Sequence, residues 1–299
     1  MSKVYFSKDL SSETILKLYE TLGVTLEGKV AVVTGGAGVL CKEFAKALAV
    51  CGAKVAVAGR TLSKVEDVAA EICEMGGEAI GVQMNVTDKE SVRAAHEEVL
   101  AKLGKCDILI NGAGGNHPRA TTDNEYFEME DMDKDIKTFF DLDDEDVEFV
   151  FNLNFIGTLL PTQEFAKDMI GREGCNIINV SSMNAYTPLT KIPAYSGAKA
   201  AISNFTQWLA VHFSHTGIRV NAIAPGFFST AQNAKLLWNE DGTPTARTNK
   251  ILNATPMGRF GKPEELLGAL LFLVDEKAAS FVTGIVIPVD GGFSAYSGV

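Results

Sequence analysis

A tyrosine and a lysine four residues apart, in the stretch YSGAK, have the types and spacing that proton transfer requires. On a helix, Tyr195 and Lys199 share one face. An ammonium group beside a phenol favours the phenolate, and so lowers the tyrosine pKa towards the working pH of a proton donor. Ser182 lies 13 residues upstream, directly after an apolar run, where its hydroxyl could hold the same substrate oxygen. Because a tyrosine and a lysine at this spacing are frequent by chance, the neighbouring motifs must show whether the pair is catalytic.

A glycine-rich turn near the N-terminus could hold the phosphates of a dinucleotide. The stretch TGGAGVLC, residues 34–41, follows the apolar run KVAVV and leads into EFAKALAV, whose apolar residues recur at helical spacing. A turn of this kind between strand and helix binds pyrophosphate through backbone N–H groups. The cofactor residues expected here are Gly35, Gly36, Gly38, Val39 and Leu40.

Apolar β-branched runs alternate with helical patterns over most of the chain. Several runs are apolar on both faces, which is typical of central strands in a parallel sheet covered by helices. The alternation predicts an α/β fold, a single domain with a doubly wound parallel sheet of about seven strands. The expected strands are 29–33, 54–58, 79–84, 107–111, 175–180, 218–223 and 284–289, and the expected helices are 40–51, 62–75, 88–103, 145–170, 194–214 and 263–274.

The composition is that of an ordinary globular protein, with 46% hydrophobic and 22% charged residues. No apolar run reaches the roughly 18 residues of a membrane helix, and the N-terminus lacks the long apolar core of a signal peptide. The five cysteines form no CxxC pair and no metal-ligand spacing, which indicates reduced thiols in a cytosolic protein. We therefore expect a cytoplasmic protein with no membrane partner and no metal.

The net charge of −11 has a local origin. Residues 123–148 contain 13 of the 38 acidic residues and two of the 27 basic ones, which leaves 25 of each sign elsewhere. Nucleic-acid binding would need a basic face, so no such partner is expected. We interpret residues 121–146 as a solvated insertion, with a lid, a cation site or a partner site as alternatives. Residues 1–27 are expected to form an N-terminal helical extension, and the polar stretch 227–258 a substrate lid.

The motifs over residues 28–293 resemble, in order, those of the short-chain dehydrogenase/reductase family. The resemblance implies a Rossmann-type fold and a nicotinamide cofactor. The matches are TGGAGVLC, NGAG at 111–114, Asn154 in NLNFIGT, Ser182, YSGAK, and Pro225-Gly226 followed by Thr230.

Family resemblance also implies roles for these residues. Tyr195 would be the acid/base, and Ser182 would bind the substrate oxygen. Lys199 would lower the tyrosine pKa and hold the nicotinamide ribose, while Asn154 would hold a water that relays the proton. The resemblance further implies a homotetramer built partly from the helix of Tyr195. The helix face expected at that subunit contact includes Ala198, Ala201 and Ile202. The further residues expected to contact the cofactor are Asn85, Val86, Asn111, Gly112, Ala113, Gly114, Pro225, Gly226, Phe228 and Thr230.

The glycine turn departs from the family pattern TGxxxGxG at its last two glycines. Cys41 is a modest change at a packing contact, but Val39 is more serious because β-branched residues tolerate positive φ poorly. We expect Gly38 to absorb the tight turn one residue early. Because every catalytic position is intact, we interpret the turn as modified but still able to bind a cofactor.

The choice between NAD and NADP depends on the end of the second expected strand. An acid there would bind the ribose hydroxyls of NAD, whereas an arginine would pair with the 2′-phosphate of NADP. Gly59 takes the acidic position and Arg60 follows, which favours NADP unless Arg60 stacks on adenine or is solvated. The family resemblance favours NAD, so both cofactors remain open.

The loops after the strands carry amides, a histidine and cations. Amides and histidine suit several hydroxyls, and Arg119 or Lys191 could pair with a carboxylate, although either could instead be solvated. The loops resemble a branch of the family that interconverts D-mannonate and D-fructuronate, while relatives acting on gluconate, sorbose or sorbitol share much of the pattern. We therefore expect a sugar-acid oxidoreductase. The candidate substrate residues are Asn116, His117, Arg119, Ser182, Asn184 and Lys191, with Asn233 in the last loop.

Two other functional classes compete with this interpretation. Val39 and Cys41 would suit a catalytically silent nucleotide-binding regulator. A sugar epimerase uses the same tyrosine–lysine pattern on this fold, but related epimerases carry a larger C-terminal substrate domain. Substituting Tyr195 by Phe separates the regulator from the oxidoreductase, because only the oxidoreductase loses its effect.

Overall fold

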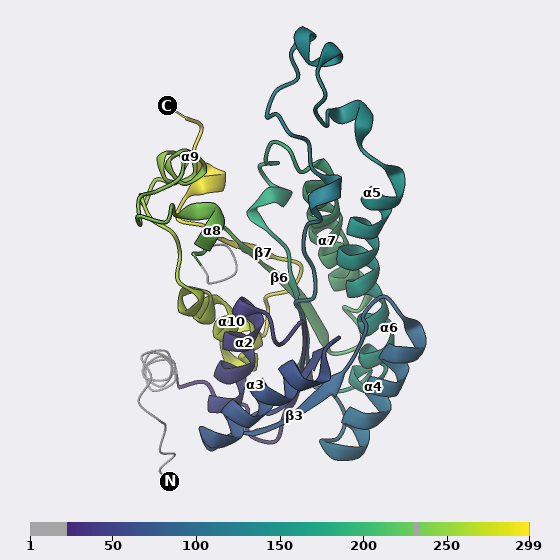
Figure 1. The fold of residues 1–299 in the computed structure, drawn as a ribbon. Coiled ribbons are helices and arrows are strands. Elements are labelled where there is room, and N and C mark those ends of the chain that lie inside the picture. Colours follow the sequence, from purple (N-terminus) through teal and green to yellow (C-terminus); the bar gives the residue numbers. More distant parts are fainter. Residues whose placement is uncertain (1–22, 230–233, 299) are drawn as a thin grey trace.

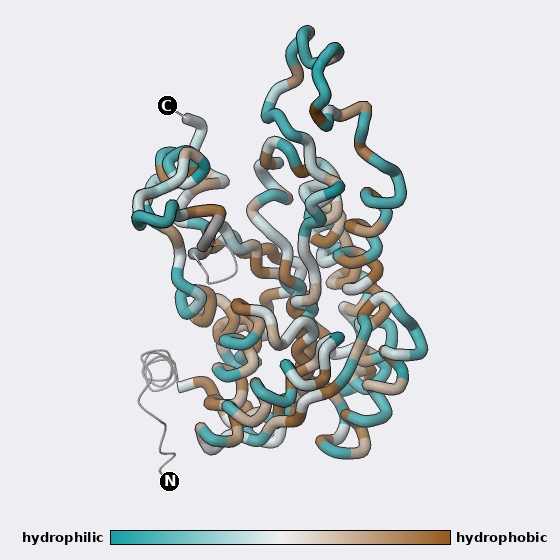
Figure 2. The backbone as a smooth tube through the Cα atoms, in the orientation of Figure 1, coloured by the Kyte–Doolittle hydropathy of each residue, from teal (hydrophilic) through white to brown (hydrophobic). Residues whose placement is uncertain are grey.

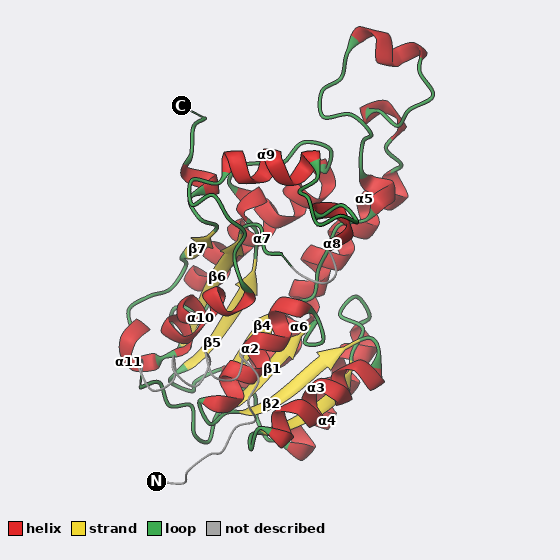
Figure 3. Ribbon diagram, turned by 60° about the vertical axis from the view of Figure 1, so that its left-hand side comes forward, coloured by secondary structure: helices red, strands yellow, loops and turns green. Residues whose placement is uncertain are grey.

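Seven parallel strands form one sheet in the order β3-β2-β1-β4-β5-β6-β7 (Figures 1 and 3). The computed structural model describes residues 23–229 and 234–298. The order reverses beside β1, as in doubly wound sheets, so the predicted fold class is confirmed. The strands are β1 (Val30–Thr34), β2 (Lys54–Gly59), β3 (Glu78–Gln83), β4 (Ile108–Asn111), β5 (Cys175–Val180), β6 (Ile218–Pro225) and β7 (Val286–Val289).

Helices cover both faces of this sheet (Figure 1). One apolar cluster joins the sheet to α2, α3 and α10, and a second joins it to α4, α6 and α7. This arrangement explains why the strand sequences are apolar on both faces. The helices are α2 (Val39–Val50), α3 (Leu62–Glu74), α4 (Lys89–Lys102), α5 (Asp144–Phe151), α6 (Gly157–Met169), α7 (Pro193–His212), α8 (Ala234–Leu237), α9 (Ala246–Ala254), α10 (Leu267–Val274) and α11 (Glu276–Ala279).

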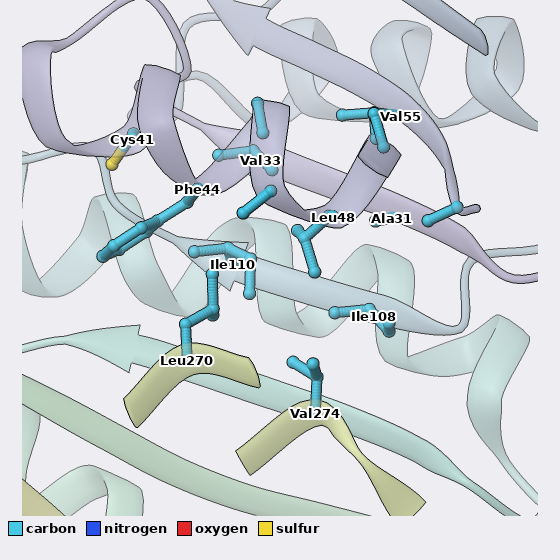
Figure 4. Packing of buried hydrophobic residues seen from close by; sticks show 14 of the residues in the cluster. Ala31, Val33, Cys41, Phe44, Leu48, Val55, Ile108, Ile110, Leu270 and Val274 are labelled. Carbon is cyan, nitrogen blue, oxygen red and sulfur yellow. The ribbon is translucent and has the colours of Figure 1, made fainter. Parts of the chain in front are cut away.

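The packing beside β1 fixes α2 and thereby the glycine turn that precedes it. Phe44 and Leu48 of α2 are fully buried, and they belong to the same cluster as Ile110 of β4 and Leu270 of α10 (Figure 4). Burying a side chain of this size stabilises the fold by about 1.5–3 kcal/mol. The start of α2 is therefore held against the sheet.

The predicted helix over 145–170 is interrupted. It consists of α5, a π-helical turn over Asn152–Ile156, and α6. Buried residues recur every four positions through this turn, at Val150, Asn154, Thr158 and Thr162, so the helical periodicity of the sequence shows no break. The helix expected over 263–274 starts as a 3₁₀ turn, Pro263–Leu266, before α10.

The acidic insertion stands away from the body of the molecule and is largely hydrophilic (Figures 1 and 2). It includes two 3₁₀ turns, Met129–Asp133 and Phe139–Asp141. The buried carboxylate of Asp131 accepts hydrogen bonds from the Glu128 N–H and the Asn124 amide, and pairs with Lys134. The segment is therefore internally bonded, and its predicted end at residue 146 lies inside α5.

Other predicted parts fall partly outside the described residues. Residues 1–22 of the expected N-terminal extension do so, while Val24 and Leu26 are buried in the core. The lid region 227–258 contains α8 and α9, but Thr230 and Asn233 lie outside the described residues. None of the helices in the described ranges is long and apolar enough to cross a membrane.

The helix face assigned to subunit contacts is wrong in part. Ala198 and Ile202 are fully buried within the chain itself, because this face of α7 packs onto the sheet and α5. The large exposed apolar residues of α7 are instead Trp208 and Val211, which follow Ile202 by six and nine residues.

Candidate active site

The glycine turn between β1 and α2 is set by backbone contacts that leave no room for side chains. Gly35 has a φ of +64°, and a Cβ added there would lie 2.9 Å from the Ala113 backbone. A Cβ at Gly36 would lie 2.7 Å from a methyl carbon of Val57. Gly38 precedes α2 with an ordinary φ of −73°. The residue with left-handed backbone in this turn is thus Gly35. The expectation that Gly38 takes the tight-turn conformation is therefore wrong.

Val39 does not obstruct this turn. It is the first residue of α2, and Lys191 is the one non-glycine residue with positive φ in the described ranges. No side chain caps the N-terminus of α2, so its first N–H groups remain open to an anion. The β-branched side chain of Val39 is therefore compatible with the turn, because position 39 has helical backbone and needs no positive φ.

Cys41 has a packing role against Gly112. A Cβ at Gly112 would overlap the Cys41 sulfur, so these two residues fit each other. Burial raises the pKa of Cys41 to about 12, which keeps its thiol protonated. The sulfur thus fills space between helix and strand where the family pattern has a glycine.

A cleft of about 590 Å³ lies beyond the carboxyl ends of β1, β2 and β4. Its glycine-lined wall and the open helix N-terminus fit the pyrophosphate of a nicotinamide dinucleotide. Of the predicted cofactor residues, it is lined by Gly35, Gly38, Val39, Leu40, Arg60, Val86, Gly112, Ala113, Gly114, Gly226 and Phe228. Sequence reasoning missed Cys41, Gly59, Met84, Leu153, Val180 and Phe227 as lining residues.

Several other predicted cofactor residues make contacts within the framework, and their contact with a cofactor stays a prediction. Gly36 packs under the turn, and Pro225 of β6 pairs with Val289 of β7. Asn111 is buried and donates hydrogen bonds to Thr162 and Asn179, which ties β4 to α6 and β5. The Asn85 side chain accepts hydrogen bonds from Thr87.

Thr34 is a residue whose role the sequence did not reveal. Its hydroxyl accepts hydrogen bonds from the N–H groups of Gly112 and Ala113, at 3.0 and 3.1 Å. These bonds hold the loop after β4 against the glycine turn after β1. Two parts of the cleft that are far apart in sequence are thereby fixed together.

Ser182, Tyr195 and Lys199 come together above β5. Ser182 follows β5 and hydrogen-bonds to Tyr195. Lys199 is 3% exposed, donates to the Val180 carbonyl at 2.8 Å, and lies 5.6 Å from the centre of the tyrosine ring. A Cβ at Gly114, in the cleft wall, would lie 3.2 Å from its Nζ. The tyrosine–lysine pair therefore stands directly beside the dinucleotide cleft.

The electrostatics of this pair differ from the expectation. Burial raises the pKa of Tyr195, and the Ser182 hydrogen bond acts against this rise. Burial lowers the pKa of Lys199 to about 8. The Lys199 amine donates its hydrogen bond to the Val180 carbonyl and not to Tyr195, so burial sets the direction of the tyrosine pKa shift. At neutral pH the Tyr195 hydroxyl therefore keeps its proton.

Asn154 positions the loop after β4. It is fully buried in the π-turn, and its amide accepts from the Gly115 N–H and donates to the Gly115 and Val150 carbonyls. The Thr158 hydroxyl donates to the Asn154 carbonyl at 2.8 Å. The proton-relay water stays a prediction, whereas the fixing of Gly115 is observed.

Asn184 is buried beside Ser182 with its side-chain oxygen unpaired among the described residues. It is 4% exposed, and its N–H donates to the Ser182 hydroxyl at 3.2 Å. Its side-chain oxygen has no hydrogen-bond partner within the described ranges. An unpaired buried amide oxygen is costly, so a hydroxyl donor from a substrate would be stabilising here.

The other candidate substrate residues are engaged by the insertion and its base. Arg119 pairs with Asp146 at 2.9 Å, and the Lys191 amine donates to the Asp123 carbonyl at 2.6 Å. These bonds hold the insertion, and the pairing of either cation with a substrate carboxylate stays a prediction. Asn116 donates to Thr121, and His117 accepts from the Arg119 N–H and stacks edge-on with Phe149.

Comparisons with known proteins agree with this geometry. Residues 29–241 match the family model of the short chain dehydrogenases. An uncharacterised oxidoreductase of Haemophilus influenzae is 60% identical over 92% of this chain and 96% of its own length. A 2-dehydro-3-deoxy-D-gluconate 5-dehydrogenase of Formosa agariphila is 33% identical over 91% of this chain and 95% of its own.

A solved structure from Haemophilus influenzae is also similar. It is provisionally described as a D-mannonate oxidoreductase with bound NAD, and it is 56% identical with a TM-score of 0.90. The match covers 97% of this chain and 100% of that chain. The protein described here therefore belongs to the short-chain dehydrogenase family. It is an oxidoreductase of that family, as its motifs predicted.

Proposed function

We propose that the protein transfers a hydride reversibly between a nicotinamide cofactor and a sugar acid, with D-mannonate and D-fructuronate as the first candidate pair. The observation that supports this reaction is that Ser182, Tyr195 and Lys199 lie together beside the glycine-lined cleft, with Lys199 against Gly114 of its wall. The substrate is supported by the similar structure described as a D-mannonate oxidoreductase, and by the buried, unpaired oxygen of Asn184.

The chain's own residues handle the oxygen and the proton. When bound, the nicotinamide supplies or accepts the hydride. In the reducing direction the Tyr195 hydroxyl donates its proton to the substrate oxygen, and Ser182 donates a hydrogen bond to the same atom as charge develops on it. Lys199 holds the pocket floor through Val180 and would reach the nicotinamide ribose. Asn154 keeps Gly115, and so the cleft wall, in place.

For the cofactor we propose NAD, with Arg60 providing some capacity for NADP. NAD is bound in the similar structure from Haemophilus influenzae. Arg60 lines the cleft at the end of β2 and is exposed, where it could meet a 2′-phosphate.

We also infer a homotetramer in the cytosol. An apolar groove between α6 and α7, lined by Ile170, Phe205 and Trp208 among others, supports a contact between subunits through these helices. The five cysteines are all free thiols, as a reducing compartment favours. Light scattering of the purified protein measures the number of subunits.

The function is tested by following nicotinamide absorbance with a set of substrates. D-Fructuronate with NADH is expected to give the highest kcat/KM. 2-Dehydro-3-deoxy-D-gluconate and D-gluconate (with NAD) test other sugar acids, and D-sorbitol and L-sorbose test neutral compounds. Turnover of the neutral compounds alone would remove the sugar-acid proposal and leave the reaction class intact.

A further inference from the structure

Three loops of the substrate edge meet at the base of the acidic insertion. They follow β4, β5 and β6, the strands whose ends carry Gly114, Ser182 and Gly226. The Thr122 N–H donates to the Lys191 carbonyl at 2.9 Å, which joins the first two loops. Glu125 pairs with Lys250 of α9 at 2.8 Å, which joins the first to the third. The junction therefore joins the loops at the carboxyl ends of these strands, the edge that also carries Ser182.

Glu125 faces several positive charges at this junction. The Lys250 hydrogen bond is the main cause that lowers the Glu125 pKa, and the charges of Lys191 and Arg247 act in the same direction. Lys191 lies four residues before Tyr195, whereas Arg247 and Lys250 belong to α9. Cations from two loops thus converge on one carboxylate near the catalytic helix.

We propose that Lys250, with Lys191 and Arg247, recognises the carboxylate of the substrate, and that Glu125 is an internal carboxylate holding the same position until a sugar acid displaces it. This inference rests on the proposed sugar-acid function. It makes Glu125 and Lys250 specificity-determining residues, because a neutral polyol gains nothing from the exchange.

The exposure of Glu125 and Lys250 explains why a substrate carboxylate would displace Glu125 from this ion pair and would not displace the partner of Arg119. The side chains of Lys250 and Glu125 are 67% and 33% exposed, so water can solvate Glu125 when it leaves. Asp146, the partner of Arg119, is only 9% exposed and would become an unpaired buried charge. Displacing Glu125 costs much less.

The two partners of this pair give opposite results if the proposal is right. Removing the internal competitor in E125Q is expected to lower the KM for the sugar acid about three- to fivefold, the range of exposed ion pairs. Removing the recognising charge in K250Q is expected to raise that KM about fivefold, and K250R is expected to restore it. In all three variants kcat stays close to wild type.

A matched pair controls for surface charge. Glu98 and Lys102 form an ion pair of similar exposure on α4, so E98Q and K102Q are expected to leave the KM unchanged. A pair that merely straps the loops together would shift the KM in the same direction in E125Q and K250Q, and that result would overturn the inference. If the wild type turns over no sugar acid, the proposed function itself fails, so the two failures are distinguishable.

Discussion

The two sides of the cleft are built by different means. On the cofactor side, backbone meets backbone, as at Gly35 against Ala113, and added atoms would collide. On the substrate side, the loops are joined by exposed ion pairs and hydrogen bonds, such as Glu125 with Lys250. Close backbone packing allows only one arrangement of the chain. Exposed ion pairs can exchange partners at a low cost in free energy.

This difference matches the two tasks of the cleft, which are to bind the same dinucleotide in every turnover and to select one substrate among several. A dinucleotide keeps the same phosphates in every turnover, so a rigid cradle suits it. Substrates of this family differ in charge and in hydroxyl pattern, so specificity lies in loops that tolerate change. Tyr195 stands where the two sides meet, and it should be the most sensitive position of all.

Tyr195→Phe is expected to have the largest effect, lowering kcat by about 10³-fold through loss of the proton donor. Cofactor binding should persist, because the cleft wall is unchanged; NADH fluorescence measures it. Ser182→Ala should cost less, since it removes one hydrogen bond and no proton. Near-normal turnover by the phenylalanine variant would place the chemistry elsewhere.

Gly112→Ala tests the rigidity of the cofactor side. Its methyl group would overlap the Cys41 sulfur and lie 2.9 Å from the Thr34 carbonyl, so we expect a loss of about 1–3 kcal/mol in the free energy of unfolding. Adding Cys41→Ala should rescue part of this loss, because the Thr34 contact remains. Chemical denaturation measures both.

The neighbouring Gly115→Ala is the matched control. A Cβ there would meet nothing within 4 Å, and its φ is not positive, so stability should change little. Equal losses at both glycines would mean that the loop, and not the Cys41 contact, governs the cost.

The sequence predicted the fold well because the strands are buried on both faces. The run CNIINV gives β5 as Cys175–Val180 with both ends correct. The π-turn at Asn152–Ile156 was missed, since buried residues keep a helical spacing of four through it, at Val150, Asn154 and Thr158. The order of loops and the family motifs were enough to gather most cleft residues.

The sequence could not reveal contacts made across long separations. Which of three glycines takes the left-handed backbone depends on Ala113, far along the chain. The pairing of Cys41 with Gly112, and of Glu125 with Lys250, likewise follows from packing and not from local pattern. The direction of the Tyr195 pKa was wrong for the same reason, because burial is a property of the folded chain.

Lys199→Met tests how much the buried Lys199 ammonium, between the cofactor side and the substrate side of the cleft, lowers the free energy of unfolding. The pKa of Lys199 falls from 10.5 to about 8 on folding, so between these values the unfolded chain binds more protons and wild-type stability rises with pH. Below about pH 8 the wild type carries the full penalty. The variant should gain about 1–3 kcal/mol there, less the lost bond to Val180, and the gain should vanish towards pH 10.

Thermal unfolding at several pH values measures this gain, and activity should fall as stability rises. A gain of equal size at pH 7 and pH 10 would show that packing, and not the buried charge, causes it. Lys102→Met provides the control, because Lys102 is exposed and pairs only with Glu98 among the described residues.

Arg60→Ala should have the smallest effect and the most selective one. Arg60 is an exposed residue at the rim of an otherwise rigid cradle, so it resembles the exchangeable contacts of the substrate side. If its guanidinium meets the 2′-phosphate, the variant should raise the KM for NADP about fivefold and leave that for NAD unchanged. Steady-state kinetics with both cofactors measure the ratio. Equal losses with NAD and NADP would instead place Arg60 on the adenine, which the two cofactors share, and would extend the rigid side of the cleft to its rim.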